Sequence, residues 1–402
     1  MRATSHHSVR IVTVAVLAAL ATGCALLPRK PAAPPAPLAP QPPPANPQPR
    51  PTLNVNANYV TNVDRPWDIA FDPVGAHDLV FTENNTGKVR AFYGGSVHDV
   101  GNMGGLSGAT FDNTGEGGLM GLAFNPSGSA LLLCVTTNVD NRVVRMSVTR
   151  DVAGHPTSLG APANIVTGMA HAGFHNGCRV RFQPNSSPPA LWVTMGDAGG
   201  GPNPQNPGSL NGKILRIREN GLVYPGNNSG ARWYSKGHRN PQGIAFHPLL
   251  NVPYDAEHGP DKDDEVNLLS NGGNAGWDPN TNGAYDQSHP MTDLAKFPNA
   301  TRPLWRSGTP TNLVTYAPSG ITFVTGAQWH AWNGALMVAF LKNSELRVLF
   351  FDGFAKIIGQ LTLPESHLGK RLRVPVENPY DGAVYVATDH DFPTTIWRIT
   401  AS

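Results

Sequence analysis

The chain returns six times to one local pattern, and this repetition constrains the fold more than any other feature. In each copy an alternating apolar segment is followed by a turn and then by a second alternating segment. Alternation with a period of two, broken by Gly, Pro and Asn, is typical of antiparallel strands, and no segment shows a sustained helical period. The copies begin at Trp67, Gly121, Arg179, Gly243, Gly320 and Leu372.

Six such repeats predict an all-β fold, a six-bladed β-propeller with four-stranded antiparallel blades, over residues 53–402. The spacing between copies widens through residues 199–212 and 270–315, so long loops should project there from one face. The innermost strands of a propeller converge on its axis. Polar residues at corresponding strand ends should therefore meet in one funnel.

The segment ahead of the repeats predicts export. Residues 1–24 resemble a signal peptide, because early arginines precede the apolar run Ile11–Gly23, which is short for a membrane span. The run ends in A-T-G-C, similar to a bacterial lipobox, so Cys24 is a candidate for lipidation. An ordinary cleaved signal and an uncleaved anchor are the alternatives. Residues 25–52 are rich in proline and should form an extended tether. We expect a chain that is lipid-anchored at the outer face of the cell membrane or located in the periplasm.

Composition argues against some classes of protein. The formal net charge is +2, and the basic residues are scattered singly, which argues against nucleic-acid binding. Membrane contact is expected through the lipid anchor only. Cys134 and Cys178 lie in apolar, strand-like segments and could form a disulfide or remain buried thiols. No CxxC or Cys/His spacing occurs, which disfavours a zinc site.

Cations recur at the predicted funnel. Arg239, Lys342 and the pair Arg371 and Arg373 occupy strand ends in three different copies. Because arginine pairs bidentately with carboxylates and phosphates, several converging cations indicate an anionic ligand. Salt bridges between blades are the alternative for each cation.

Two further groups could carry chemistry. His175 precedes one predicted strand and Asp197 follows the next, and a histidine beside a carboxylate is a general-base arrangement. Ordinary roles in turns are the alternative. The acidic segment Glu257–Asn267 offers carboxylates and carbonyl oxygens to calcium, although its spacing is not that of an EF-hand. Solvated loop charges are the alternative there.

Several long motifs resemble one family, the soluble PQQ-dependent sugar dehydrogenases, which include aldose sugar, glucose and sorbosone dehydrogenases. The motifs run in the family's order from about Arg65 to the C-terminus. They are G-E-G-G-L-M-G-L-A-F-N-P (115–126), H-N-G-C-R (175–179), G-D with N-G-K-I-L-R-I, G-H-R-N-P-Q-G-I-A-F-H-P (237–248), E-H-G-P with D-E-V-N, and N-A-G-W (274–277). The resemblance implies a six-bladed propeller with pyrroloquinoline quinone (PQQ) near its axis. It also implies oxidation of the C1 hydroxyl of an aldose-type sugar to a lactone.

The resemblance further implies residue roles. His175 would take the proton from the anomeric hydroxyl, Asp197 would orient His175, and Arg239 would stabilise charge on the quinone oxygen. The backbone carbonyls of Gly259 and Pro260 would bind calcium, and Glu265 resembles a ligand of a second, structural calcium. The cofactor-binding residues would be Glu116, Arg239, Asn240, Lys342, Arg371 and Arg373.

Two other functions compete with this one. A non-catalytic binding or sensor propeller of the same family would keep the fold without the reaction. A calcium-dependent lactonase would leave the cations unexplained. The presence of His175, Asp197, Arg239 and Lys342 favours the dehydrogenase, acting on a small sugar with an external electron acceptor that the sequence does not identify. Cys178 departs from the Gly or Ser that is usual in the family.

Overall fold

The computed structural model describes residues 50–402 except 310–311, 354–355, 367–368 and 391–392. The expected signal peptide with Cys24, and the proline-rich segment up to residue 49, lie outside the described residues. Within the described residues, no helix has the length and apolar character needed to cross a membrane.

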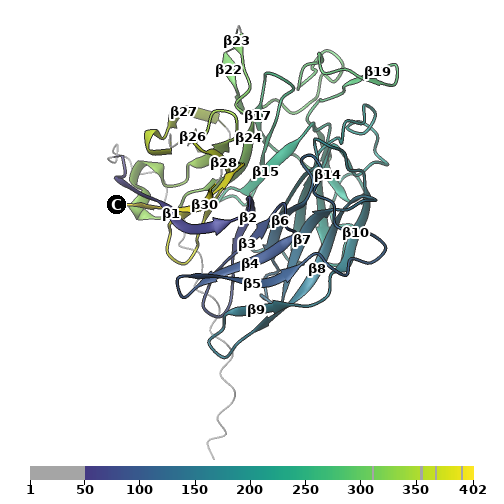
Figure 1. The fold of residues 1–402 in the computed structure, drawn as a ribbon. Helices are drawn as coiled ribbons and strands as arrows, with labels where there is room; N and C mark the ends of the chain where they lie inside the picture. Colours follow the sequence, from purple (N-terminus) through teal and green to yellow (C-terminus); the bar gives the residue numbers. More distant parts are fainter. Residues whose placement is uncertain (1–49, 310–311, 354–355, 367–368, 391–392) are drawn as a thin grey trace, which may run out of the picture. The chain divides into compact units, whose positions relative to one another are not determined.

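Most of the described strands belong to six sheets of four or five strands arranged around one axis, which confirms the predicted all-β, six-bladed propeller (Figure 1). We number the sheets as blades, beginning with the first complete one. Blade 1 contains β2 (Pro66–Phe71), β3 (Leu79–Glu83), β4 (Lys88–Tyr93) and β5 (Ser96–Asn102). Blade 2 contains β6 (Leu119–Phe124), β7 (Ala130–Thr136), β8 (Asn141–Arg150) and β10 (Ala163–Met169), with β9 (Pro156–Leu159) added to β8. Blade 3 contains β11 (Gly177–Phe182), β12 (Ala190–Met195), β13 (Lys213–Arg218) and β14 (Trp233–Lys236), with the parallel β18 (Gly273–Asn274) at its edge.

The second half of the chain completes the ring. Blade 4 contains β15 (Pro241–Phe246), β16 (Pro253–Glu257), β17 (Glu265–Leu268) and β21 (Trp305–Arg306). Blade 5 contains β24 (Pro318–Phe323), β25 (Leu336–Phe340), β26 (Glu345–Asp352) and β27 (Lys356–Thr362). Blade 6 contains β28 (Arg371–Glu377), β29 (Val384–Asp389), β30 (Thr394–Ala401) and, from the start of the chain, β1 (Leu53–Val63). The described helices are the short 3₁₀ segments η1 (Ala327–Trp332) and η2 (Pro364–Ser366).

The innermost strands are the six repeats found in the sequence. β2, β6, β11, β15, β24 and β28 each contact the next, and β28 contacts β2. Glycines make this close approach possible. A Cβ on Gly121 of β6 would lie 2.4 Å from the Cys178 carbonyl oxygen, and a Cβ on Gly243 of β15 would lie 2.5 Å from that of Ser319. The glycine that opens several repeats is therefore a contact point between blades.

Apolar side chains fill the spaces between blades. The cluster between blades 2 and 3 includes Cys134 and Cys178, both fully buried. The structure joins these two cysteines in a disulfide between β7 and β11, with their Cα atoms 5.8 Å apart. This separation is ordinary for a disulfide.

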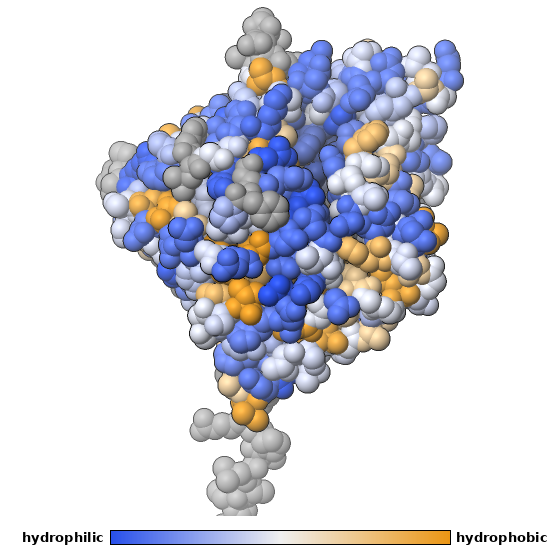
Figure 2. Space-filling model, in the orientation of Figure 1, coloured by the Kyte–Doolittle hydropathy of each residue, from blue (hydrophilic) through white to orange (hydrophobic). Residues whose placement is uncertain are grey.

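The long insertion at 270–315 carries two small ribbons, β19 (Asn280–Thr281) with β20 (Ala284–Tyr285), and β22 (Gly308–Thr309) with β23 (Asn312–Leu313). Both ribbons project from the same end of the propeller, as expected (Figure 1). The loop 199–212 joins this insertion through Gln205, whose Nε2 donates to Asn274 Oδ1 at 3.0 Å and to the Trp277 carbonyl at 2.8 Å. Hydrophilic residues dominate the face drawn in Figure 2, and hydrophobic residues form only scattered patches there.

Candidate active site

A cavity of about 460 Å³ lies where the inner strands of all six blades begin. It brings together almost every residue that the sequence analysis selected. Those lining it are Glu116, His175, Arg239, Asn240, Gly259, Pro260, Lys342, Arg371 and Arg373. Asp197 lies behind His175, and Glu265 lies on β17, away from the lining.

His175 and Asp197 form a directly bonded pair. His175 Nδ1 lies 2.8 Å from Asp197 Oδ1, and both side chains are buried. The local backbone is tight: His175 has φ 59°, and a Cβ on Gly196 would lie 2.0 Å from the His175 carbonyl oxygen. The His175 backbone N–H donates to Glu116 Oε2 at 2.9 Å. Glu116 therefore anchors the turn that carries the histidine.

Two aromatic residues from the 270–315 insertion hold Asp197. The Tyr285 hydroxyl donates to Asp197 Oδ2 at 2.7 Å, and Trp277 Nε1 donates to the same oxygen at 2.9 Å. Burial, reinforced by the Asp197 charge, raises the pKa of Tyr285, so the hydroxyl keeps its proton as a donor. A carboxylate with these fixed donors accepts Nδ1–H of His175 and leaves the Nε2 lone pair available as a base.

Arg239 also lines the cavity, and its carbonyl oxygen accepts from Asp197 N at 2.8 Å. Its Nη1 donates to the Gly259 carbonyl at 2.7 Å, and its Nη2 donates to Gln287 Oε1 at 2.6 Å. Its guanidinium carbon lies 5.7 Å from the centre of the Trp277 ring. Burial lowers the pKa of Arg239 from its ordinary value, but an arginine remains a cation at neutral pH.

Three arginines share one buried carboxylate. Asp389 Oδ2 accepts from Arg373 Nη2 at 2.7 Å, and Asp389 Oδ1 accepts from Arg65 Nε at 2.8 Å. Arg371 Nε lies 3.5 Å from Asp389 Oδ2. Burial would raise the pKa of Asp389, but Arg373, His390 and Arg65 hold it well below its usual range. With Arg239 and Lys342 added, the cations lining the cavity outnumber the nearby carboxylates Asp389 and Glu116.

Several buried polar atoms of the lining have no hydrogen-bond partner among the described residues. They include both amide atoms of Asn240, Nε2 of His258 and Nε of Arg373. A buried polar atom left unpaired costs about 1–3 kcal/mol. The atoms are therefore suited to a polar ligand, and the surrounding charge favours an anionic one.

A sequence-family model described as "Glucose / Sorbosone dehydrogenase" matches residues 63–397. The chain belongs to this family. An aldose sugar dehydrogenase of Escherichia coli is 30% identical over 227 residues, covering 54% of this chain and 58% of that protein. An uncharacterised protein of Synechocystis is 32% identical over 237 residues, covering 54% of each. The chain thus matches only about half of the length of these curated relatives.

A solved structure extends the similarity across the propeller. The PQQ-bound aldose sugar dehydrogenase of Streptomyces coelicolor superposes with a TM-score of 0.69 at 26% identity, covering 87% of this chain and 99% of that one. The family relationship agrees with the resemblance inferred from the motifs.

In this member of the glucose/sorbosone dehydrogenase family, the sequence did not reveal every residue of the site. Arg65 and Gln242, which line the cavity, were missed. Tyr285, Gln287 and Asp389, which bond residues of the site, were missed too. Arg65 could have been found by aligning the repeats, because it lies just ahead of β2 as Arg239 lies just ahead of β15. Tyr285 and Gln287 come from an insertion without a repeat register.

One arginine of the inner strands forms a salt bridge between blades. Arg179 is fully buried, pairs with Asp68 at 2.7 Å and stacks 4.0 Å from the centre of the Trp67 ring. It therefore joins blades 3 and 1 across the axis and does not line the cavity.

Proposed function

We propose that the chain is an exported, PQQ-dependent dehydrogenase that oxidises the C1 hydroxyl of an aldose-type sugar to the lactone. The observation that carries the proposal is the His175–Asp197 pair beside a cavity with an excess of cations. Removing a proton next to a redox cofactor that carries carboxylates requires a base beside an anion-binding cavity. The His175–Asp197 pair and the surrounding cations provide these two features. Family membership supports the same conclusion.

The cavity suits the tricarboxylate quinone PQQ. Arg371, Arg373 and Lys342 would pair with its carboxylates, and the unpartnered amide of Asn240 would hydrogen-bond its polar edge. Glu116 also lines the cavity and would contribute through the turn that it anchors. When bound, PQQ would supply the two-electron chemistry by accepting hydride from the sugar carbon.

The protein would supply the base and the charge. His175 Nε2 would take the proton of the sugar hydroxyl, and the resulting imidazolium would be stabilised by Asp197 through Nδ1–H. Arg239 would stabilise negative charge that develops in the cavity, because its guanidinium is buried and fixed by Gly259 and Gln287.

Calcium would bind the carbonyl oxygens of Gly259 and Pro260, which line the cavity. The loop that presents them is held by Asp264, whose Oδ1 accepts from Gly259 N at 2.9 Å and whose Oδ2 accepts from Ala317 N at 3.0 Å. Arg239 Nη1 already donates to the Gly259 oxygen. We therefore expect calcium to shift this guanidinium towards the rest of the cavity. Glu265, with Oε2 unpartnered, would serve a second calcium.

The proposal also includes export, lipidation of Cys24 and tethering through residues 25–52. These three parts are supported by the sequence motifs alone. They would place the propeller outside the cytoplasm, with a small sugar as substrate and a separate electron acceptor. Mass measurement of the mature protein from membranes would reveal the lipid. A chain released without modification at Cys24 would contradict the anchor but not the reaction.

One experiment tests the function. PQQ and calcium are added to the purified chain, the bound-quinone absorbance is recorded, and its reduction by a panel of aldoses is followed. His175→Ala should retain PQQ and lose turnover, whereas Arg371→Ala with Arg373→Ala should mainly weaken PQQ binding. No PQQ binding would refute the dehydrogenase. Binding without reduction by any aldose would favour a sensor propeller.

A further inference from the structure

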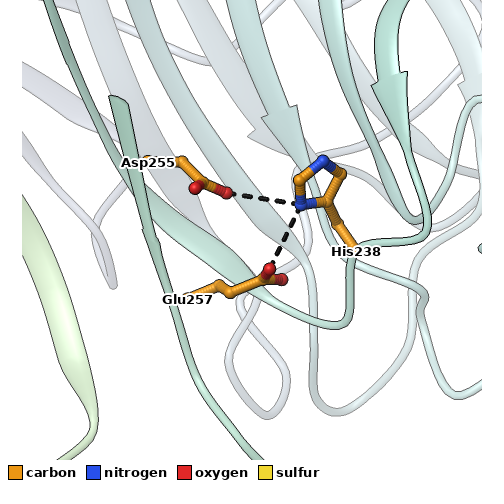
Figure 3. Close-up of side chains that lie close together, drawn as sticks. All are labelled: His238, Asp255 and Glu257. Carbon is orange, nitrogen blue, oxygen red and sulfur yellow. Dashed lines mark hydrogen bonds and ion pairs between the residues drawn. The ribbon is translucent and has the colours of Figure 1, made fainter. Parts of the chain in front are cut away.

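A fully buried cluster lies between blades 3 and 4, next to the cavity but outside its lining. It consists of His238, in the connection from β14 to β15, with Asp255 and Glu257 on β16. Figure 3 shows the imidazole facing both carboxylates. One nitrogen or oxygen from each side chain lies within 4.8 Å of the others. The proposed function uses none of the three side chains.

The distances within the cluster match the spacing of ligands around a shared cation. His238 Nδ1 lies 3.3 Å from Asp255 Oδ2 and 3.2 Å from Glu257 Oε1. Charge-assisted N–H···O bonds are usually shorter, at about 2.7–2.9 Å, so one N–H shared between the two carboxylates would make two long, weak hydrogen bonds. Ligands about 2.0–2.2 Å from a tetrahedral zinc ion lie roughly 3.4 Å apart. The two observed separations are close to that ligand spacing.

Unpartnered oxygens in the same place point to a missing partner. Neither carboxylate oxygen of Asp255 accepts a hydrogen bond from a described residue, and its ion pair is with His238 alone. Asn267 lies opposite Asp255 in the β16–β17 register, and its Oδ1 is also unpartnered. Its Nδ2 is used, donating to Glu257 Oε1 at 3.1 Å. A buried carboxylate without donors is costly unless a cation compensates it.

Neighbouring groups hold the His238 and Glu257 side chains in the orientation that metal ligands require. His238 Nε2 lies 2.7 Å from Ser235 Oγ, so an Nε2–H tautomer would donate to the serine and direct the Nδ1 lone pair at the carboxylates. Glu257 is fixed by its second oxygen, which accepts from Arg239 N at 3.0 Å. Such outer contacts are typical of histidine and carboxylate metal ligands.

We propose that His238, Asp255 and Glu257 bind a divalent transition-metal ion of the zinc class, which fixes the junction of blades 3 and 4 behind Arg239. An imidazole nitrogen with carboxylate oxygens suits zinc, whereas calcium takes six to eight oxygens. The site differs from those expected for calcium at Gly259 and at Glu265. It lacks cysteine, so spacing rules based on Cys/His motifs do not reveal it.

The test measures metal, not turnover. The purified full-length chain is stripped with a chelator that prefers zinc to calcium, dialysed, and reloaded with Zn²⁺ alone or Co²⁺ alone. We expect roughly one retained Zn²⁺ per chain, a lower melting temperature after stripping, and visible absorption bands with Co²⁺. A chain that retains no Zn²⁺ and melts unchanged after chelation would overturn the proposal and leave the dehydrogenase proposal standing.

Variants assign the ligands. Asp255→Asn should lose the Zn²⁺, and Glu265→Gln, which alters a neighbouring buried carboxylate, should keep it. If Asp255→Asn does not fold, Ser235→Ala still tests the site, because loss of an outer contact weakens metal binding by about 10–100-fold. Ser366→Ala changes a buried serine in η2, which contacts β26 of blade 5, and should bind Zn²⁺ normally. Equal Zn²⁺ binding by the Ser235→Ala and Ser366→Ala chains would contradict the assignment.

Discussion

At the scale of the residue, Asp197 controls the candidate base. It is fully buried and accepts from His175, Tyr285 and Trp277. We predict that Asp197→Asn lowers kcat of the PQQ-loaded enzyme by about 10²–10⁴-fold, because the amide no longer fixes the tautomer or stabilises the imidazolium. Steady-state kinetics with a reducing aldose measure the loss.

Tyr285→Phe is the matched control for that change. It removes one hydrogen bond to the Asp197 carboxylate and keeps the ring. A hydrogen bond to a charged group contributes about 1.5–3 kcal/mol, so the loss in kcat should be about 10–100-fold. A Tyr285→Phe loss as large as that of Asp197→Asn would mean that the tyrosine itself takes part in proton transfer.

A second residue links stability to pH. Burial raises the pKa of Glu377 to about 8, although hydrogen bonds from Thr325 oppose the shift. The unfolded carboxyl releases its proton near pH 4.5, so between about pH 4.5 and 8 the folded chain holds the extra proton and stability falls as pH rises. Above the pKa of Glu377 in the folded chain, its contribution to the free energy of unfolding no longer changes with pH.

Glu377→Gln should therefore flatten this dependence and increase the free energy of unfolding at pH 8 by about 1–3 kcal/mol. The glutamine can still accept from Thr325 N and donate to Thr325 Oγ1. Urea unfolding at pH 5 and at pH 8 provides the comparison. The prediction is contradicted if both proteins lose the same stability between the two values.

At the scale of the element, the inner strands depend on their glycines. Gly243 of β15 has no room for a Cβ, which would lie 2.5 Å from the Ser319 oxygen on β24. We predict that Gly243→Ala destabilises the propeller by about 1–3 kcal/mol, because blades 4 and 5 must separate slightly. Chemical denaturation measures the change.

Gly359 provides the control for Gly243. It lies on the outer strand β27, and a Cβ there would meet only a Phe350 ring carbon at 3.7 Å. Gly359→Ala should leave stability unchanged or increase it slightly, since alanine restricts the unfolded chain more than glycine does. Equal losses for the two variants would indicate that strand propensity, not blade spacing, limits the substitution.

The same elements show what the sequence could predict. Inner strands were visible because Gly121, Gly243 and Gly320 open similar apolar segments, and the site residues ahead of β11 and β15 followed from that register. The irregular insertion has no period, so Tyr285 could not be placed beside Asp197. The His238 cluster was missed for a related reason: a histidine from the connection ahead of β15 meets two carboxylates on β16, and no known motif has this spacing.

At the scale of the whole molecule, the ring is closed by strands from its two ends. β1 pairs with β30, with Leu53 opposite Ala401 and Val63 opposite Thr394. Arg65, just after β1, then bonds Asp389 on β29 and brings the closure to the wall of the cavity. The strand pairing that closes the ring and the arginines around Asp389 therefore both belong to the region of blade 6.

Two truncations separate the tether from the closure. Removing residues 1–49 should leave the melting temperature and PQQ affinity of the propeller unchanged, because those residues precede β1. Removing residues 1–63 deletes β1, exposes the edge of β30 and should abolish cooperative unfolding or cause aggregation. Calorimetry and light scattering distinguish these outcomes. If the shorter chain still melts cooperatively at the original temperature, then β1 does not hold the ring closed, and the packing between blades 1 and 6 must be sufficient alone.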